Sequence, residues 1–363
     1  MRLVIDGQRL TAKRTGVGRC LESLLAEWAE TGWPLKETLL VGCDAEGLRG
    51  VAQTPGLTTM VVGEGWPGLV WETLGLGRVL RKGDLLFAPA NLVPWTWRGK
   101  TVAVIYDTLP WSTPTSFPWH VKLRFGWRYR LAARRADRII VPSAATARDV
   151  SQVHDVPSKR IRVIYPGPEP RFRPLAAGSS EIMEARRAVG VGDAPFLLFV
   201  GKRSKRRNVS AVLEAFKRQR KVMPELKLVF VGPEGGAKIP SKEVGVVNAG
   251  HVDEATLHGL YASAIALLYP SNHEGFGLPV VEAQACGCPV VTLRNSALVE
   301  SGGDAAWYLP SAAPREIAKA IETLTTDEEK HRKLVTLGLA NARRFSREVF
   351  AREVKQEIQL VAG

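Results

Sequence analysis

The sequence is poor in cysteine, with only four in 363 residues. Cys20 and Cys43 lie far along the chain from Cys286 and Cys288, which excludes the disulfide framework of a small secreted domain. The C-x-C spacing of the last two matches no zinc-binding pattern. We therefore expect reduced thiols in the core or at helix ends.

Long hydrophobic stretches are also missing. No apolar run reaches the roughly eighteen residues that a transmembrane helix needs. The first residues, MRLVIDG, lead directly into a predicted strand rather than into a charged start followed by a hydrophobic signal core. The expectation is a soluble, cytoplasmic protein, which could still bind peripherally at the inner face of the membrane.

Acidic residues are outnumbered by basic ones. Lys and Arg number 50 against 36 Asp and Glu, a formal charge of +14, which favours partners that carry phosphate: nucleotides, nucleic acid or an anionic membrane surface. The sequence also lacks an Asp-x-Asp pair or a cluster of His and carboxylates where a Mg²⁺-diphosphate site would need one. No metal and no cofactor are therefore expected.

Two successive sets of alternating apolar runs and helix-like stretches make up the chain. A chain of this length is expected to form two domains of similar size. The β-type runs lie at residues 3–5, 38–41, 85–88, 101–105, 138–141, 161–164, 196–200, 226–231, 244–247, 264–269 and 290–293, with helical patterns near 209–221, 254–262 and 314–337. This alternation predicts an α/β fold with two doubly wound parallel sheets.

The boundary between the halves is predicted from PGPEPRFRPLAAGSS, residues 166–180, which is rich in Pro and Gly and has little periodicity. We place an N-terminal Rossmann-like domain at residues 1–175 and a second one at 176–345. Residues 346–363 are predicted to form a C-terminal helix that could return to the N-terminal domain. Ligands bind beyond the carboxyl ends of such strands, so two facing sheets would form an interdomain cleft.

The most informative segment is AIALLYPSNHEGFGLPVVEAQACGCPVVTL, residues 264–293. Its apolar start is typical of a buried parallel strand. Gly275, Gly277 and Pro279 prevent the strand from continuing and predict the N-terminus of a helix. Backbone N–H groups near residues 277–280 then lack partners within the helix and can point at an anion.

Two carboxylates flank this anion site with seven residues between them: Glu274 in the loop and Glu282, expected in the first helical turn. Such a pair suits a phosphorylated ligand with several hydroxyl groups. Each feature also has a structural interpretation, because Glu282 could complement the helix dipole and Gly287 could be an ordinary helix stop. A loop carboxylate beside glycines has no evident role in folding, so we interpret the pair as functional.

The stretch HEGFGLPVVEAQACGCPVV resembles the E-x7-E signature of the GT-B glycosyltransferases, specifically the large retaining family 4 (glycosyl transferases group 1). The resemblance covers almost the whole chain. It implies that Glu274 contacts hydroxyls of the donor sugar and that Glu282 binds the ribose of the nucleotide. The backbone that would line the donor sugar and diphosphate is that of Gly275, Phe276, Gly277 and Leu278.

A second loop after a strand, GKRSKRRN at residues 201–208, is strongly basic. Its cations would repel one another unless an anion joins them, although a solvated charge run is the alternative. By resemblance Arg207 matches the lysine that binds the diphosphate in family 4, with Lys202 and Lys205 as further donor-binding candidates. We expect Arg203 and Arg206 to face solvent.

In the N-terminal half, RTGVGRC resembles the glycine-rich first loop of family 4. The resemblance implies that Gly16 and Gly18 let the backbone approach the donor phosphate or the acceptor, and that Arg19 supplies charge. A simple turn is the alternative. The segment is no dinucleotide fingerprint, because Glu22 stands at the third glycine position.

The strand at residues 101–105 resembles the family strand that ends in His-Asp, except that Tyr106 replaces the histidine while Asp107 stays. Asp107 is a catalytic and acceptor-side candidate, or a cap of the following turn. Further acceptor-side candidates are Tyr106 itself, Asn91, which is expected to face the cleft, and Ser143.

Residues 119–138 interleave Trp119, Phe125, Trp127 and Tyr129 with many Arg and Lys. Three interpretations stay open: a plain core helix with snorkelling arginines, an anionic bilayer surface, or an RNA-binding face. Nucleic acid is the least favoured partner, because no known nucleic-acid motif is present.

The residues and the resemblance together predict a retaining, metal-independent hexosyltransferase. It would move a sugar from a nucleoside diphosphate sugar to a glycan, a lipid-linked acceptor or a small molecule. Glu274, Arg207 and Asp107 are the candidate catalytic residues, with Glu274 orienting the sugar and Arg207 stabilising charge on the departing diphosphate. The alternatives are a GT-B enzyme of different chemistry, such as a nucleotide-sugar epimerase, and a basic membrane- or nucleic-acid-binding protein that keeps the scaffold; the intact pair of glutamates favours transfer.

Overall fold

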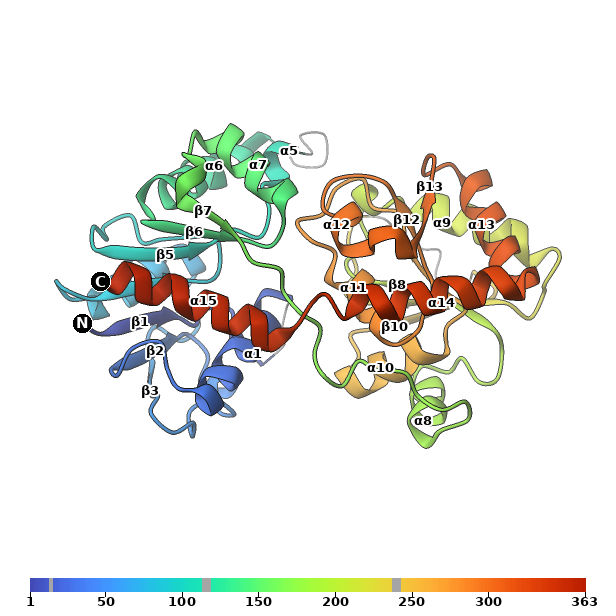
Figure 1. Ribbon diagram of the computed structural model, residues 1–363, viewed down its shortest axis with the longest axis horizontal. Helices are drawn as coiled ribbons and strands as arrows, with labels where there is room; N and C mark the ends of the chain where they lie inside the picture. The colour runs from blue at the N-terminus through green and yellow to red at the C-terminus, as the bar shows by residue number, and fades with distance from the viewer. Residues whose placement is uncertain (13–15, 113–118, 237–242) are drawn as a thin grey trace. The chain divides into compact units, whose positions relative to one another are not determined.

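A computed structural model describes residues 1–12, 16–112, 119–236 and 243–363. The chain divides into two compact units, one formed by Met1–Gly167 with Ser346–Gly363 and the other by Pro168–Phe345. Each unit is a parallel β-sheet with helices on both faces, so the predicted α/β class with two doubly wound sheets is confirmed (Figure 1). The division falls at the start of the predicted linker, eight residues before the boundary placed at residue 175.

In the described part of the first unit, the strands run in the order β3-β2-β1-β4-β5-β6-β7 and all pair in parallel. These strands are β1 (Leu3–Asp6), β2 (Thr38–Gly42), β3 (Thr58–Val61), β4 (Leu85–Ala88), β5 (Lys100–Val104), β6 (Arg138–Val141) and β7 (Ile161–Val163). The helices are α1 (Gly16–Thr31), α2 (Ala45–Leu48), α3 (Gly68–Val70), η1 (Trp71–Leu76), α4 (Gly77–Val79), α5 (Leu109–Ser112), α6 (Trp119–Arg135), α7 (Ala144–His154), η3 (Ser158–Arg160) and α15 (Arg347–Ala362).

The second unit, over its described residues, has the strand order β10-β9-β8-β11-β12-β13, again all parallel. Its strands are β8 (Phe196–Val200), β9 (Lys227–Val231), β10 (Val246–Gly250), β11 (Ala266–Tyr269), β12 (Val290–Leu293) and β13 (Ala306–Leu309). Its helices are α8 (Ser180–Ala188), η4 (Lys205–Arg207), α9 (Val209–Arg220), α10 (Glu254–Ser263), α11 (Leu278–Ala285), α12 (Leu298–Gly302), η5 (Gly303–Ala305), α13 (Pro314–Thr326) and α14 (Glu328–Ala342).

The central strands are apolar because both of their faces are covered. Every residue of β4, β8 and β11 is buried, as expected for parallel strands between two helical layers. In each unit the buried residues form one cluster on either face of the sheet. The strand order reverses between β1 and β4 in the first unit and between β8 and β11 in the second, which is where doubly wound sheets bind ligands.

The last helix, α15, belongs to the first unit although it follows the second in sequence (Figure 1). Trp28 on α1 is fully buried, and its indole N–H donates to the carbonyl oxygen of Ala351 on α15 at 3.0 Å. The two connections between the units touch each other, because a Cβ at Gly167 would collide with the backbone of Ser346 and Arg347. Only glycine fits at this crossing.

The structure adds two strands that the sequence does not predict, and it divides one predicted helix. The edge strand β3 has the sequence TTMV and is mostly exposed, so it carries no apolar run; β13, AWYL, is only half buried. The helical pattern at 314–337 is two helices, because Asp327 ends α13 and its carboxylate accepts from the N–H of Lys330 at the start of α14.

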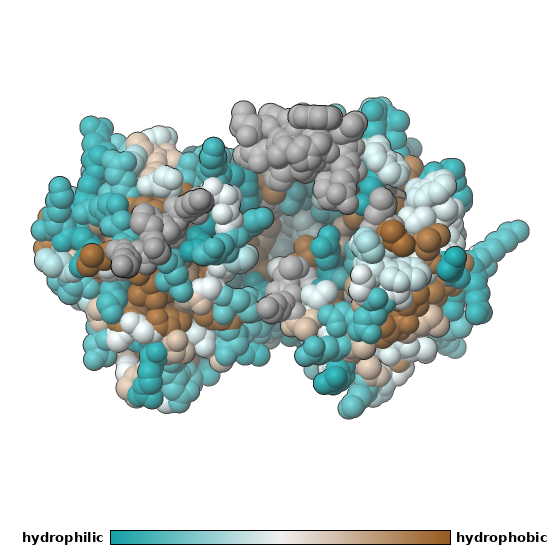
Figure 2. Space-filling model, turned by 180° about the vertical axis from the view of Figure 1, so that it is seen from behind, coloured by the Kyte–Doolittle hydropathy of each residue, from teal (hydrophilic) through white to brown (hydrophobic). Residues whose placement is uncertain are grey.

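None of the helices in the described part of the chain is both long and apolar enough to cross a bilayer. On the face shown in Figure 2, hydrophilic residues predominate and hydrophobic residues form local patches.

Candidate functional site

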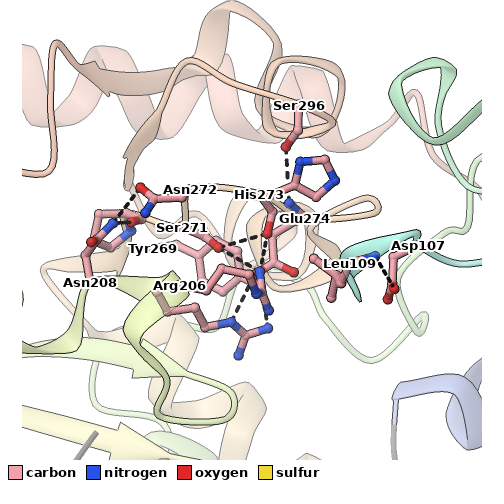
Figure 3. A network of polar contacts seen from close by, with 12 residues as sticks. Asp107, Leu109, Arg206, Asn208, Tyr269, Ser271, Asn272, His273, Glu274 and Ser296 are labelled. Carbon is pink, nitrogen blue, oxygen red and sulfur yellow. Dashed lines mark hydrogen bonds and ion pairs between the residues drawn. The ribbon is translucent and has the colours of Figure 1, made fainter. Parts of the chain in front are cut away.

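The two loops that the sequence singles out in the second unit follow adjacent strands. The loop at residues 201–208 follows β8, and the loop at 270–277 follows β11, which pairs with β8 at the reversal of strand order. The fold therefore brings the basic loop and the Glu274 loop to one edge of the sheet. Asn208 joins them, since its side-chain amide donates to the carbonyl oxygen of Pro270 at 2.7 Å and to Oδ1 of Asn272 at 2.8 Å (Figure 3).

Glu274 is the centre of this site. Its Oε1 atom lies 2.7 Å from Nη1 of Arg206 and 2.9 Å from Nε of Arg207, and the residue is only 8% exposed. Burial alone would raise the pKa of this carboxyl, but Arg207 and Arg206 outweigh that effect and lower the pKa to about 2. Glu274 is thus held as a carboxylate, and its backbone N–H is fixed by Ser296 Oγ at 3.1 Å.

Arg207 is held on three sides. Besides Glu274, its Nη2 donates to the hydroxyl of Tyr269 at 3.0 Å, and its guanidinium lies over the Tyr269 ring at 5.1 Å from the centroid. A Cβ at Gly201, whose φ is +115°, would collide with the guanidinium. Glycine after β8 therefore makes the space in which Arg207 meets Glu274, a function of Gly201 that the sequence pattern does not reveal.

The expectation that Arg203 and Arg206 face solvent is wrong. Arg206 Nη1 also contacts Ser271 Oγ at 2.9 Å and the carbonyl oxygen of His273 (Figure 3). Arg203 is 5% exposed, and it bonds Asn248 Oδ1 at 2.7 Å and Glu234 at 3.1 Å. Strand β10 and the loop after β9 supply acceptors for Arg203, and the loop after β11 supplies those for Arg206. A sequence does not show which of these segments lie close together.

The donor-binding candidates Lys202 and Lys205 lie in the same loop with exposed side chains. They are available to a ligand but do not share the burial of Arg207. Among the residues that the structure describes, no group of three or more His, Cys, Asp or Glu is placed to hold a metal ion.

Helix α11 begins at Leu278, after Gly277 with φ +97°, and Pro279 stands in its first turn. A Cβ at Gly277 would lie 2.9 Å from Leu298 Cδ2, so close packing as well as backbone conformation requires glycine. The Phe276 ring packs edge-on against Phe345 at 5.3 Å. This packing turns the Phe276 side chain into the protein and leaves Gly275 half-buried beside the helix start.

Glu282 lies on α11 one turn further along than expected, because the helix starts only at Leu278. It therefore does not belong to the first turn, and a role in complementing the helix dipole loses its geometric basis. The residue is 1% exposed, and its Oε2 accepts a hydrogen bond from the Tyr261 hydroxyl at 3.0 Å. Tyr261, on α10, is a site residue that the sequence does not reveal, since a tyrosine on an apolar helix face is normally core.

The glycine-rich segment of the first unit does not form the loop expected from the sequence. Gly16 and Gly18 both lie in the first turn of α1, with Arg19 following them, and Gly18 is buried. The preceding residues 13–15 of this segment lie outside the described residues. A contact between these glycines and a donor phosphate stays a prediction.

The acceptor-side candidates Asn91, Asp107 and Ser143 form hydrogen bonds within the first unit. Asn91, at φ +65°, accepts from the N–H of Tyr106 at 2.8 Å and donates to the Tyr129 hydroxyl at 3.1 Å. Asp107 Oδ1 accepts from the N–H of Leu109 at 3.1 Å, as a turn cap would (Figure 3). Ser143 is fully buried and caps α7 through the N–H of Thr146.

Tyr106, which replaces the family histidine, packs against the core cluster beside α1 and α15, and burial raises the pKa of its hydroxyl well above the ordinary value. The side chains of Asn91, Tyr106 and Ser143 are therefore used in building the unit. Their roles toward an acceptor, like that of Asp107, stay predictions.

Two family models match separate parts of the chain. Residues 14–171 match Glycosyltransferase Family 4, and residues 182–338 match Glycosyl transferases group 1. The second match includes both glutamates and Arg207, and together the two matches cover both units.

Curated relatives carry related descriptions. The chain is 28% identical over 273 residues to a serotype-specific mannosyltransferase, WbdA, of Escherichia coli. This match covers 71% of this chain and 32% of that protein. It is also 28% identical over 230 residues to a D-inositol 3-phosphate glycosyltransferase of Thermobispora bispora, covering 58% and 53%. The match thus spans about a third of the length of the Escherichia coli relative.

Solved structures show the same fold. The Anabaena protein Alr3699/HepE, crystallised with UDP and glucose, superposes with a TM-score of 0.76 at 19% identity, covering 98% of this chain and 99% of that one. WaaG, a glycosyltransferase involved in lipopolysaccharide biosynthesis, gives a TM-score of 0.75 at 15% identity, with coverage of 98% and 99%. With its two doubly wound sheets, the Glu274 to Glu282 motif and both family matches, the chain belongs to the GT-B glycosyltransferases of group 1.

Proposed function

We propose that this protein transfers a sugar from a nucleoside diphosphate sugar to an acceptor hydroxyl, with retention of anomeric configuration. The observation that carries the proposal is the buried contact of Glu274 with Arg206 and Arg207 at the reversal of strand order, beside the start of α11. Positive charge and a helix N-terminus suit a diphosphate, while the carboxylate suits sugar hydroxyls.

Each residue has a distinct part in this proposal. Arg207, with Lys202 or Lys205, would stabilise the charge that develops on the departing diphosphate. Glu274 would orient the sugar, and Glu282, fixed by the Tyr261 hydroxyl, would accept from the ribose hydroxyls. The acceptor would be a saccharide or a lipid-linked saccharide, as the names of the mannosyltransferase and lipopolysaccharide relatives suggest.

A panel of nucleotide sugars tests the function. UDP-glucose and GDP-mannose come first, because UDP and glucose are bound in one structural neighbour and mannosyl transfer is named in the relatives. Binding is scored by thermal shift, hydrolysis by release of nucleoside diphosphate, and retention by the anomeric proton signals of the product. A protein that binds no nucleotide sugar and releases no nucleoside diphosphate from any of them would contradict the proposal.

Replacing Glu282 with glutamine should weaken binding of the bare nucleoside diphosphate by ~1–3 kcal/mol, because a ribose diol donates more strongly to a carboxylate than to an amide. The amide oxygen can still accept from Tyr261, so the melting temperature should change little. Calorimetric titration measures the affinity. Unchanged affinity would remove Glu282 from the ribose site.

Activity should be complete in excess chelator. In the proposed site Arg207, with Lys202 or Lys205, would supply the positive charge by which a metal would otherwise neutralise the diphosphate. The measurement is nucleoside diphosphate release after dialysis against EDTA. Activity that is lost and then restored by Mg²⁺ or Mn²⁺ would show that a cation stabilises the leaving group.

We also propose that α6 contacts an anionic membrane surface. Trp127 is 52% exposed, and Arg130 and Arg134, three and seven residues further on, are exposed on the same side of the helix. Arg128 points inward, to an ion pair with Glu72 of η1. For Trp119 and Phe125 the structure describes the backbone, as part of α6, but not the side chains.

Sedimentation with liposomes tests this contact. The protein should pellet with anionic but not with neutral vesicles, and less at high salt, because each nearby cation contributes ~1 kcal/mol and salt screens it. Trp127→Ala should reduce the pelleted fraction, whereas Met183→Ala, which removes an equally exposed side chain from the second unit, should not. If Trp127→Ala and Met183→Ala pellet equally, or if the wild-type protein binds neither anionic nor neutral vesicles, α6 does not contact the membrane.

A further inference from the structure

Arg206 connects the two loops of the site through both its backbone and its side chain. Its carbonyl oxygen accepts from the N–H of Asn272 at 2.9 Å. Its Nη1 contacts Ser271 Oγ, the carbonyl oxygen of His273 and Oε1 of Glu274. The Arg206 side chain thus fixes the loop after β11 to the loop after β8, and its contacts in the β11 loop include the Glu274 carboxylate.

Arg206 and Arg207 share one oxygen of Glu274, but their other contacts differ. Arg207 also contacts Tyr269, through its hydroxyl and its ring face. Arg206 instead bonds the polypeptide that carries Glu274. If Arg207 turns toward a diphosphate, Arg206 still neutralises Glu274 and keeps it in place.

We propose that Arg206 is a positioning residue, which fixes the Glu274 carboxylate and residues 271–274 so that Glu274 can meet the donor sugar while Arg207 is free to bind the diphosphate. This inference rests on the proposed function. All three contacts come from one nitrogen, Nη1, whose two N–H groups are fixed in the plane of the guanidinium, whereas a lysine ammonium on a flexible stem would not fix the same geometry.

Kinetics of Arg206→Gln and Arg206→Lys provide the first test. Both variants should lower kcat for sugar transfer by at least about tenfold and change the Kd of bare nucleoside diphosphate by less than about twofold. Lys221→Gln is the control, because it removes a positive charge from an exposed position of the same unit that has no part in the proposed site. Equal losses in kcat and nucleotide affinity would make Arg206 a phosphate ligand, and an unchanged kcat would also overturn the proposal.

Acid stability provides a second test that needs no activity. The pKa of Glu274 in the folded protein lies below its ordinary value, so its contacts with Arg206, Arg207 and Tyr269 contribute stability that is complete above the ordinary pKa and is lost as the pH falls toward about 2. Without Arg206 that pKa rises toward its ordinary value. The fall in Tm between about pH 7 and about pH 3 should therefore be smaller in Arg206→Gln than in Lys221→Gln.

The two tests separate this inference from the proposed function. If the wild-type protein turns over no nucleotide sugar but the acid profile changes as expected, the function fails and the fixing of Glu274 by Arg206 stands. If the wild type is active and both the kcat and the acid profile of Arg206→Gln match those of Lys221→Gln, the positioning role of Arg206 is wrong.

Discussion

Replacing Arg207 with alanine should lower kcat for sugar transfer by ~10² or more. Arg207 lies at the carboxyl edge of β8, with its guanidinium on Glu274 and over the Tyr269 ring. Its attraction to a leaving diphosphate grows as negative charge develops, and an interaction that grows in this way lowers the barrier rather than tightening the ground state. Initial rates at varied donor concentration give kcat and KM separately.

Lys221→Ala is the control for Arg207→Ala, because Lys221 belongs to the same unit, directly after α9, but is exposed and has no part in the proposed site. Its loss should change kcat by less than about threefold, since exposed charges are well screened. Arg207→Lys should recover part of the activity, because it keeps the charge but loses the stacking on Tyr269. If Arg207→Ala lowers kcat no more than Lys221→Ala does, or raises only KM, Arg207 does not stabilise the leaving group specifically.

Glu274→Gln should reduce turnover of the nucleotide sugar by ~10² while leaving the Kd of the bare nucleoside diphosphate within about twofold of the wild type. An amide keeps the size of the carboxyl group but cannot orient sugar hydroxyls by charge-assisted hydrogen bonds. It also leaves Arg206 and Arg207 facing a neutral group in a buried site, so Tm should fall. Turnover is measured by product release and affinity by titration.

Glu234→Gln controls for the loss of one negative charge in the same unit. Glu234 pairs with Arg203, but its side chain is 90% exposed, so both kcat and Tm should stay close to wild type. Equal losses of turnover and of nucleotide affinity in Glu274→Gln would contradict a role specific to the sugar. In that case the carboxylate serves mainly to hold the arginines that bind the diphosphate.

The fold could be predicted from the sequence wherever a strand is buried on both faces. The runs at β4, β8 and β11 are continuously apolar, and the structure forms strands there. The edge strand β3 was beyond prediction, because its side chains are mostly exposed and its four residues carry no periodic signal. An edge strand such as β3 is stabilised mainly by pairing with its neighbour, here β2. The apolar pattern of its own sequence does not reveal that neighbour.

The site shows the same division at the level of residues. Glu274 and Arg207 could be identified because each follows a buried strand beside glycines. The inward position of Arg206 could not be identified, because its acceptors lie 65 or more residues further along the chain. Two of these three acceptors, Ser271 Oγ and the carbonyl oxygen of His273, are ordinary loop groups. Tyr261 was missed for a related reason: its partner Glu282 lies on another helix.

The passage of the chain out of the first unit and back has a consequence for the order of folding during synthesis. Residues 168–345 are one uninterrupted segment with its own core, so the second unit can fold as soon as it has left the ribosome. The first unit, although translated earlier, must wait for α15, because Trp28 and its neighbours are covered only when residues 347–362 arrive. Until then the part of this apolar face that α15 covers is open, and we expect nascent chains released before residue 346 to be the aggregation-prone species.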